Sequence, residues 1–320
     1  MRAPGFRRSR LRVRTAVAYS PAAITNFFKI QFDSSHSAIA ATGGGYILSR
    51  GTRTKAGLRI GRKGTVSTIV NGDRRYKART TKRAVGLLLA AHGRPFGELQ
   101  LKQLVETPIG SGFGSSAASA ISAVYATSAV MNIDRPKQEL AFFAHQAEII
   151  EQTGLGTVSV VYDAVGAGAI IEGGVPGAAH FVNVEVPTDA RLVTAYIAPY
   201  DKRKALSSRL LTEKINTLGS DAIRGFLSDP SLDTIAEEGE RFSKKLGLES
   251  HEVRKLADLA KAAGAKYASQ NMIGYAVHAL VDQDRSKRVA EAFSGLGSGI
   301  RVDTFEVGTE RAGVIKANRT

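Results

Sequence analysis

The chain of 320 residues contains no cysteine, and none of its apolar runs approaches the ~20 residues that a membrane-spanning helix needs. Without thiols it can form neither disulfides nor thiolate metal sites. No apolar segment follows its basic first residues, as a secretory signal would require. We therefore expect a cytoplasmic protein that does not enter a membrane. Its 43% hydrophobic content suffices, at this length, for one large core or, as we predict, two domains.

Acidic residues are scarce in the first 97 positions, which hold 20 lysines and arginines but only Asp33 and Asp73. Such an asymmetry is found in proteins that bind nucleic acid. However, no aromatic residues are interleaved with these charges, as a stacking platform for single strands would require. Residues 1–10 form a basic tail that could be disordered, and the charges of residues 50–83 fit the solvated face of short strands. We keep nucleic-acid binding only as a secondary hypothesis.

Glycine is concentrated in the stretch Pro108-Ile-Gly-Ser-Gly-Phe-Gly-Ser-Ser-Ala-Ala, which runs directly into an alanine-rich segment. Glycines at alternate positions can take backbone angles that other residues avoid, and they expose bare amides. The alanine-rich run favours a helix from about Ser115 to Met131. Amides of the first helical turn and the positive end of the helix dipole stabilise an anion. The stretch therefore predicts a phosphate-binding loop, and the alternative is a flexible turn capped by Ser115 or Ser116.

This stretch resembles the second motif of the GHMP kinases, Pro-x-x-x-Gly-Leu-Gly-Ser-Ser-Ala-Ala, with Phe113 in place of leucine. The superfamily includes galactokinase, homoserine kinase and mevalonate kinase. The resemblance implies an α+β protein with a ribosomal-S5-domain-2-like α/β domain over residues 11–189 and a ferredoxin-like α+β domain over residues 190–320. It also implies that ATP is held by Pro108, Gly110, Ser111, Gly112, Phe113, Gly114, Ser115, Ser116 and Ala117.

A helix is expected from Asp134, as its cap, to about Gln152, and it places His145 and Glu148 on one face because they are three residues apart. Taken alone, the pair would be a surface histidine and a solvated glutamate. In the superfamily, a glutamate of the corresponding helix and the serine of the second motif hold Mg²⁺, which prefers oxygen ligands. The resemblance therefore implies that Ser116 and Glu148 bind the metal and serve catalysis.

Further motifs resemble one branch of the superfamily, the archaeal pantoate kinases. They are Pro-x-x-Ile-Thr-x-Phe-Phe from Pro21, Ala-x-x-Ala-Glu ending at Glu148, Thr153-Gly-Leu-Gly-x-Val, and the single-glycine segment Gln270-Asn-Met-Ile-Gly. The resemblance implies transfer of phosphate from ATP to the primary hydroxyl of pantoate, on an archaeal route toward coenzyme A. Thr42 and His145 would contact the acceptor, and Thr157 would orient its hydroxyl. The acceptor could instead be another small hydroxy or amino acid, such as homoserine or mevalonate, and a homodimer is a further possibility.

Two positions depart from the family pattern. Thr157 stands where an aspartate general base is expected, and a threonine can hydrogen-bond a substrate but cannot act as a base near neutral pH. Asp163, from the same region, could substitute for it. Glu172 stands where an arginine is expected for the acceptor. These departures leave open a catalytically silent member of the fold that binds nucleic acid through its basic first 97 residues.

Outside these motifs, periodicity and turn residues predict the remaining elements. We expect a helix at 80–92, capped by Thr80 or Thr81 and ended by Gly93, and strands meeting at a corner within 159–171. The predicted strands otherwise cover residues 11–20, 37–48, 191–198, 270–281 and 300–307. The predicted helices otherwise cover residues 205–217, 220–227, 232–246, 250–263 and 284–293.

Overall fold

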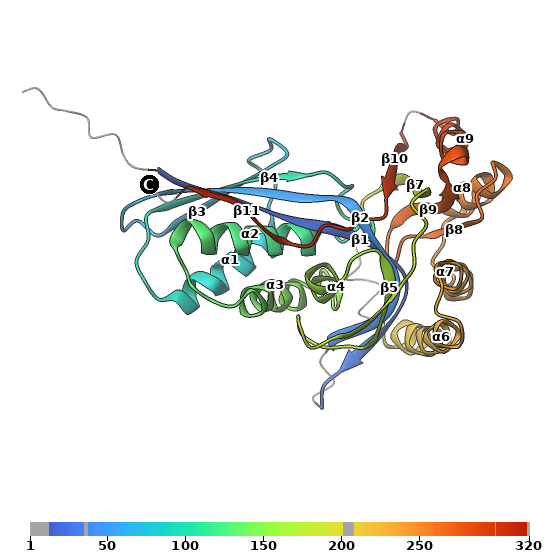
Figure 1. The fold of residues 1–320 in the computed structure, drawn as a ribbon, viewed down its shortest axis with the longest axis horizontal. Helices are drawn as coiled ribbons and strands as arrows, with labels where there is room; N and C mark the ends of the chain where they lie inside the picture. The colour runs from blue at the N-terminus through green and yellow to red at the C-terminus, as the bar shows by residue number, and fades with distance from the viewer. Residues whose placement is uncertain (1–12, 35–37, 201–207, 298, 319–320) are drawn as a thin grey trace, which may run out of the picture.

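A computed structural model describes residues 13–34, 38–200, 208–297 and 299–318 (Figure 1). The predicted basic tail, residues 1–10, therefore lies outside the described residues. The elements form two sheets with helices packed on them, which confirms the α+β class. None of the helices among the described residues is long and apolar enough to span a bilayer.

The larger sheet is built on two long antiparallel strands, which together make most of its surface. The strand order is β11-β1-β2-β4-β3, with β5 paired to β2 and β6 to β5. β3 and β4 are parallel, whereas the other pairs are antiparallel. The strands are β1 (Val13–Phe32), β2 (Ala38–Arg59), β3 (Thr65–Val70), β4 (Glu98–Val105), β5 (Ala167–Glu172), β6 (His180–Val184) and β11 (Gly313–Asn318).

Four helices cover one face of this sheet: α1 (Arg79–His92), α2 (Ser115–Met131), α3 (Lys137–Glu151) and α4 (Thr157–Asp163) (Figure 1). The central helix, α2, is buried along nearly its whole length because its small residues let the sheet and the other helices approach closely. Ala16 and Ala18 of β1 and Leu101 of β4 meet Ile121 and Val124 of α2 in the core.

The smaller sheet is entirely antiparallel, in the order β10-β7-β9-β8. Helices α8 and α9 pack on this sheet. Helix α7 packs against both β8 and β1 and so joins the two sheets, and α6 packs against α7 and β1 (Figure 1). The strands are β7 (Ala190–Ala198), β8 (Tyr267–Gln270), β9 (Tyr275–Asp282) and β10 (Arg301–Glu306). The helices are α6 (Arg209–Ser228), α7 (Leu232–Leu246), α8 (His251–Ala262) and α9 (Gln283–Ser294).

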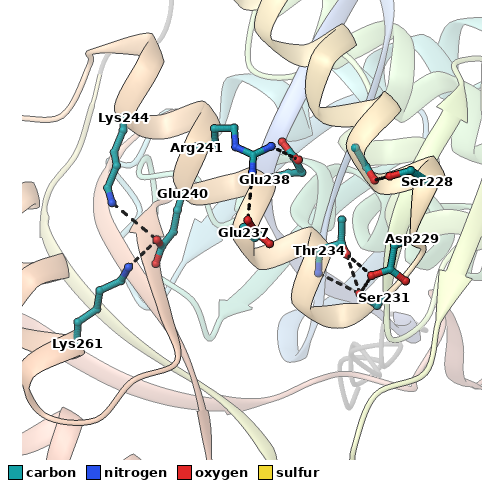
Figure 2. Close-up of polar contacts among 11 residues, drawn as sticks. Ser228, Asp229, Ser231, Thr234, Glu237, Glu238, Glu240, Arg241, Lys244 and Lys261 are labelled. Carbon is teal, nitrogen blue, oxygen red and sulfur yellow. Dashed lines mark hydrogen bonds and ion pairs between the residues drawn. The ribbon is translucent and has the colours of Figure 1, made fainter.

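The joining helix α7 is fixed by its cap and by ion pairs of its glutamates (Figure 2). Ser231 caps it by accepting a hydrogen bond from the Thr234 amide at 3.1 Å. Glu240 pairs with Lys261 of α8 at 2.6 Å, while Arg241 bridges two glutamates of its own helix. The helix therefore has a defined start and a tie to its neighbour, α8.

Most predicted helices are confirmed, with corrections at their ends. α2 and α7 have the predicted bounds, and Gly93 ends α1 in a left-handed conformation. The predicted caps of α1 and α3 are wrong: the N-caps are Ala78 and Pro136, without a side-chain hydrogen bond. A single helix, α6, replaces the two predicted between 205 and 227, of which residues 205–207 lie outside the described part.

The predicted strand at 159–163 is also wrong, because these residues belong to α4. Val158 and Val161 point into the core formed with α2, and this burial outweighs the β preference of the β-branched run. Only the second part of the predicted corner, β5, is a strand. The domain boundary at residue 190 stays a prediction, and β11 from the predicted second domain pairs with β1 of the first.

Candidate active site

The glycine-rich loop lies between β4 and α2 and adopts the backbone that its glycines permit. Gly110, Gly112 and Gly114 have φ angles of 85°, 78° and 62°, all in the left-handed region. A Cβ on Gly112 would lie 2.7 Å from Cβ of Asn271, and one on Gly114 would lie 3.0 Å from Cγ2 of Thr157. Glycine is therefore required at both positions by conformation and by close packing.

Hydrogen bonds tie this loop to both halves of the molecule. Ser111 Oγ donates to the carbonyl of Ala198, and the amide of Tyr200 donates to the carbonyl of Gly110 at 2.7 Å. On the other side, the amide of Ala23 in β1 donates to the carbonyl of Phe113 at 3.3 Å. The loop is thus held between the two sheets.

The first turn of α2 brings together the two predicted metal ligands. Ser116 Oγ donates to Oε1 of Glu148 at 2.7 Å, and Glu148 is 1% exposed. The alternative role of Ser115 or Ser116 as a helix cap is wrong, because Gly114 is the N-cap and no side chain caps the helix. Because the Ser116 hydroxyl does not cap the helix, it can donate its hydrogen bond to the Glu148 carboxylate of α3.

A cavity opens in front of the loop and has the chemistry of a nucleotide site. Its lining includes Gly110, Ser111, Gly112, Phe113, Gly114, Ser115 and Ser116. Three cationic side chains also line it, Arg75, Lys77 and Arg79, next to an apolar cluster that includes Val70 and Val105. Such a combination fits an anionic phosphate chain attached to an apolar base. Of the predicted loop residues, Pro108 and Ala117 are buried and do not line it.

The three cations were not identified as site residues from the sequence. They belong to the basic run of residues 50–83, which was interpreted as a solvated face. The signal that could have found them is their position after a strand: β3 and β4 are parallel, so the segments that follow both strands meet at one edge of the sheet. Arg75 and Lys77 follow β3, as the glycine-rich loop follows β4.

A second cavity lies beside the first and is mainly apolar. It is lined by Thr25, Phe28, Thr42, the Gly43–Gly45 run, Tyr46, Thr153, the Gly154–Thr157 segment, Phe181, Met272 and Ile273, among others. Thr153 lines both cavities, so they adjoin at this residue. Thr42 is 5% exposed, and its hydroxyl has no hydrogen-bond partner within the described ranges. The second cavity therefore offers hydroxyl groups to a small ligand, next to the nucleotide site.

The structure places Thr42 and Thr157 at this second cavity but not His145. The imidazole of His145 is buried in α3, with Nε2 3.1 Å from the carbonyl oxygen of Ile39. Burial lowers its pKa, so the ring is neutral near pH 7. Its predicted contact with a substrate therefore stays a prediction.

The two acidic residues singled out in the sequence also lie away from the lining. Asp163 ends α4, and its carboxylate accepts a hydrogen bond from the Gly177 amide at 2.9 Å. Burial raises the pKa of this carboxyl group, although the bond from Gly177 lowers it. Glu172 ends β5, opposite His180. Among the described residues, no Asp, Glu, Lys, Arg or His lines the second cavity.

The donor set at α2 and α3 fits a hard cation that is shared with phosphate oxygens. Ser116 and Glu148 supply oxygen atoms only, and a Cβ on Gly154 would lie 2.5 Å from Oε2 of Glu148. Gly154 therefore keeps the carboxylate free of a steric clash. The described part of the chain has no cluster of three His, Cys, Asp or Glu side chains that could hold a metal by itself.

Comparison with known proteins shows what the chain as a whole is similar to. Residues 79–163 match the family model of the GHMP kinases N terminal domain. The chain is 26% identical over 297 residues to a pantoate kinase of Thermococcus kodakarensis, covering 92% of this chain and 96% of the relative. It is 28% identical over 270 residues to a pantoate kinase of Methanospirillum hungatei, covering 82% and 86%.

Among solved structures, a phosphotransferase related to the CoA biosynthesis pathway aligns with a TM-score of 0.81 and 26% identity. This alignment covers 95% of the chain and 99% of that protein. In fold and in its glycine-rich loop the chain is therefore similar to kinases of the GHMP superfamily, which agrees with the resemblance found in the sequence. Within the superfamily, both curated relatives named above are pantoate kinases.

Proposed function

We propose that this kinase transfers the γ-phosphoryl group of ATP to the primary hydroxyl of pantoate and so forms 4-phosphopantoate, on a route toward coenzyme A. The proposal rests chiefly on the two cavities that adjoin at Thr153, one lined by the phosphate loop and the other by hydroxyl and apolar groups. The similarity to two pantoate kinases over most of the chain supports this choice of acceptor.

ATP would bind in the first cavity, with its phosphates at the loop amides and at the N-terminus of α2. Arg75, Lys77 and Arg79 would add positive charge around the phosphates. Ser116 and Glu148 would hold Mg²⁺, which when bound neutralises charge on the phosphate oxygens. Positioning and charge neutralisation supply most of the catalysis in phosphoryl transfer. The main catalytic elements would therefore be the phosphate loop and the side chains of Arg75, Lys77 and Arg79 that line the same cavity.

Pantoate would bind in the second cavity, where its two methyl groups match the apolar wall of Phe28, Met272 and Ile273. The hydroxyl of Thr42, buried without a partner in the described part of the chain, would donate a hydrogen bond to the substrate. Among the residues that the structure describes, no cationic side chain lines this cavity, so from these residues the carboxylate of pantoate would be met by hydroxyl and backbone N–H groups.

Thr157 would orient the acceptor hydroxyl, since it lines the second cavity and touches the loop at Gly114. With no carboxylate in the described lining, no side chain there can act as a general base. The absence of such a base costs about 10²–10⁴-fold in rate, which leaves most of a kinase's acceleration intact. A cytoplasmic location and a homodimer remain predictions.

The proposal is tested by offering purified protein ATP and Mg²⁺ with pantoate, homoserine, mevalonate or no acceptor, and by following phosphorylated products by mass spectrometry. We expect phosphorylation of pantoate with the highest kcat/KM. Phosphate on homoserine or mevalonate but not on pantoate would replace this acceptor by another. Binding of RNA or DNA that falls steeply with salt, without turnover of any acceptor, would favour the silent nucleic-acid-binding alternative.

A further inference from the structure

The turn between β8 and β9, residues Asn271–Gly274, lies between the phosphate loop and the second cavity. On one side, glycine contacts leave no space between this turn and the phosphate loop: a Cβ on Gly112 would lie 2.7 Å from Cβ of Asn271, and one on Gly274 would overlap the backbone of Ser111. On the other side, Met272 and Ile273 line the acceptor cavity. The position of this turn therefore fixes the position of the phosphate loop.

The turn is braced from behind by a buried histidine of β9. His278 Nδ1 lies 2.9 Å from Oδ1 of Asn271, and Nε2 lies 3.3 Å from Oγ of Ser269. Because an amide oxygen only accepts, Nδ1 carries the proton, and Nε2 then accepts from the Ser269 hydroxyl. Burial lowers the pKa of His278 to about 3, so this neutral form persists at neutral pH.

His278 lines neither cavity, and it is 2% exposed. It therefore cannot contact a substrate bound in either cavity directly. A plain core residue at this position in β9 would be apolar, since a buried imidazole is costly unless both nitrogens are hydrogen-bonded. Here both nitrogens are engaged, and one of them holds the residue that touches Gly112.

We infer that His278 is a positioning residue: by orienting the carboxamide of Asn271 it holds the turn beneath Gly112 and so keeps the loop amides in place for nucleotide phosphates. The inference rests on the proposed nucleotide site at the loop but not on the identity of the acceptor. Its effect passes through Asn271, so the two side chains should be energetically coupled.

The test measures ADP binding, with Mg²⁺, to the full-length protein by calorimetry, because this needs no acceptor. We expect His278→Ala to weaken ADP binding about tenfold, the size of roughly one buried hydrogen bond. His278→Asn can donate from near the Nδ1 position and should stay within about threefold of wild type. Ser269→Ala, which removes only the bond to Nε2, serves as the matched control and should also bind ADP nearly as wild type does.

A double-mutant cycle separates positioning from general stability. If His278 acts through Asn271, adding His278→Ala to Asn271→Ala should weaken ADP binding no further than Asn271→Ala does alone. Wild-type ADP affinity in His278→Ala, or full additivity in the cycle, would overturn the inference. If His278→Ala does not fold, His278→Gln replaces it, because the glutamine amide lies near the position of Nε2 and cannot donate to Asn271. Equal ADP affinities of the His278→Asn and His278→Gln variants would then overturn the inference. If the wild-type protein binds ADP but does not phosphorylate pantoate, only the proposed acceptor is contradicted.

Discussion

Glu148 is the residue whose chemistry is tested most directly, because its buried carboxylate meets Ser116 at the start of α2. We predict that Glu148→Gln lowers kcat by at least about 100-fold, since a bound metal ion contributes several kcal/mol to transition-state stabilisation. Steady-state kinetics over a range of Mg²⁺ concentrations measures this. Glu139→Gln, an exposed glutamate in the first turn of the same helix, is the matched control and should be unaffected. Equal activity of the two variants would remove Glu148 from the metal site.

Thr157 provides the second residue-scale prediction. Thr157→Val keeps the shape of the side chain but removes the hydroxyl, so kcat/KM for the acceptor should fall about tenfold while KM for ATP changes little. Thr157→Ser keeps the hydroxyl and should retain most of the activity. Initial rates with each substrate varied in turn measure this. An unchanged rate in the valine variant would show that Thr157 does not orient the acceptor.

The site residues that could be predicted from the sequence are those that belong to a short contiguous motif. The residues around Gly112 indicated the phosphate loop, and the pair Ser116 and Glu148 followed from the resemblance. Only the fold, however, places Ser116 Oγ 2.7 Å from Glu148 Oε1. Arg75 and Lys77 could not be found in this way, because their approach to the loop depends on the parallel pairing of β3 with β4. A nonlocal pairing of this kind leaves no local pattern.

At the scale of elements, the phosphate loop and the β8–β9 turn behave as one packed unit. We predict that Gly112→Ala is more destabilising than Gly72→Ala, although both glycines have positive φ angles. A Cβ on Gly72 meets no atom within 4 Å, so its cost is conformational, about 1–2 kcal/mol. At Gly112 overpacking against Asn271 adds about 1–3 kcal/mol. Urea unfolding of both variants gives the comparison, and equal losses would contradict the close packing.

Helices were predicted better than the strands around them. α2 and α7 carry strong local signals, whereas α4 is a helix despite its valines because Val158 and Val161 are buried against α2 and α3. The length of β1 and β2 was missed as well. Both strands run far past their predicted ends because they pair with each other along nearly their whole length, from Val13 opposite Arg59 to Phe32 opposite Ala38. Propensity describes a segment in isolation, whereas the structure of α4 and the lengths of β1 and β2 are set by tertiary packing and strand pairing.

At the scale of the whole molecule, stability should depend on pH through His278. Its pKa is about 3 in the folded protein but about 6.5 when it is exposed, so below pH 6.5 the unfolded chain binds the additional proton. The free energy of unfolding should therefore fall as the pH drops from 6.5 toward 3, by up to about 1.4 kcal/mol per pH unit. Urea unfolding of wild type and His278→Asn at pH 7 and pH 5 measures this. The wild type should lose more stability, and equal losses would contradict the burial of a neutral imidazole.

The pairing of β11 with β1 has a consequence for synthesis of the protein. β11 is made only after all of the smaller sheet, yet it pairs with β1, which precedes the smaller sheet in the chain. Until residues 313–318 emerge, β1 presents an open row of N–H and C=O groups to other nascent chains. Growing polypeptides of this kinase should therefore depend on chaperones until the edge closes, and mistakes in translation near the last strand should produce aggregates.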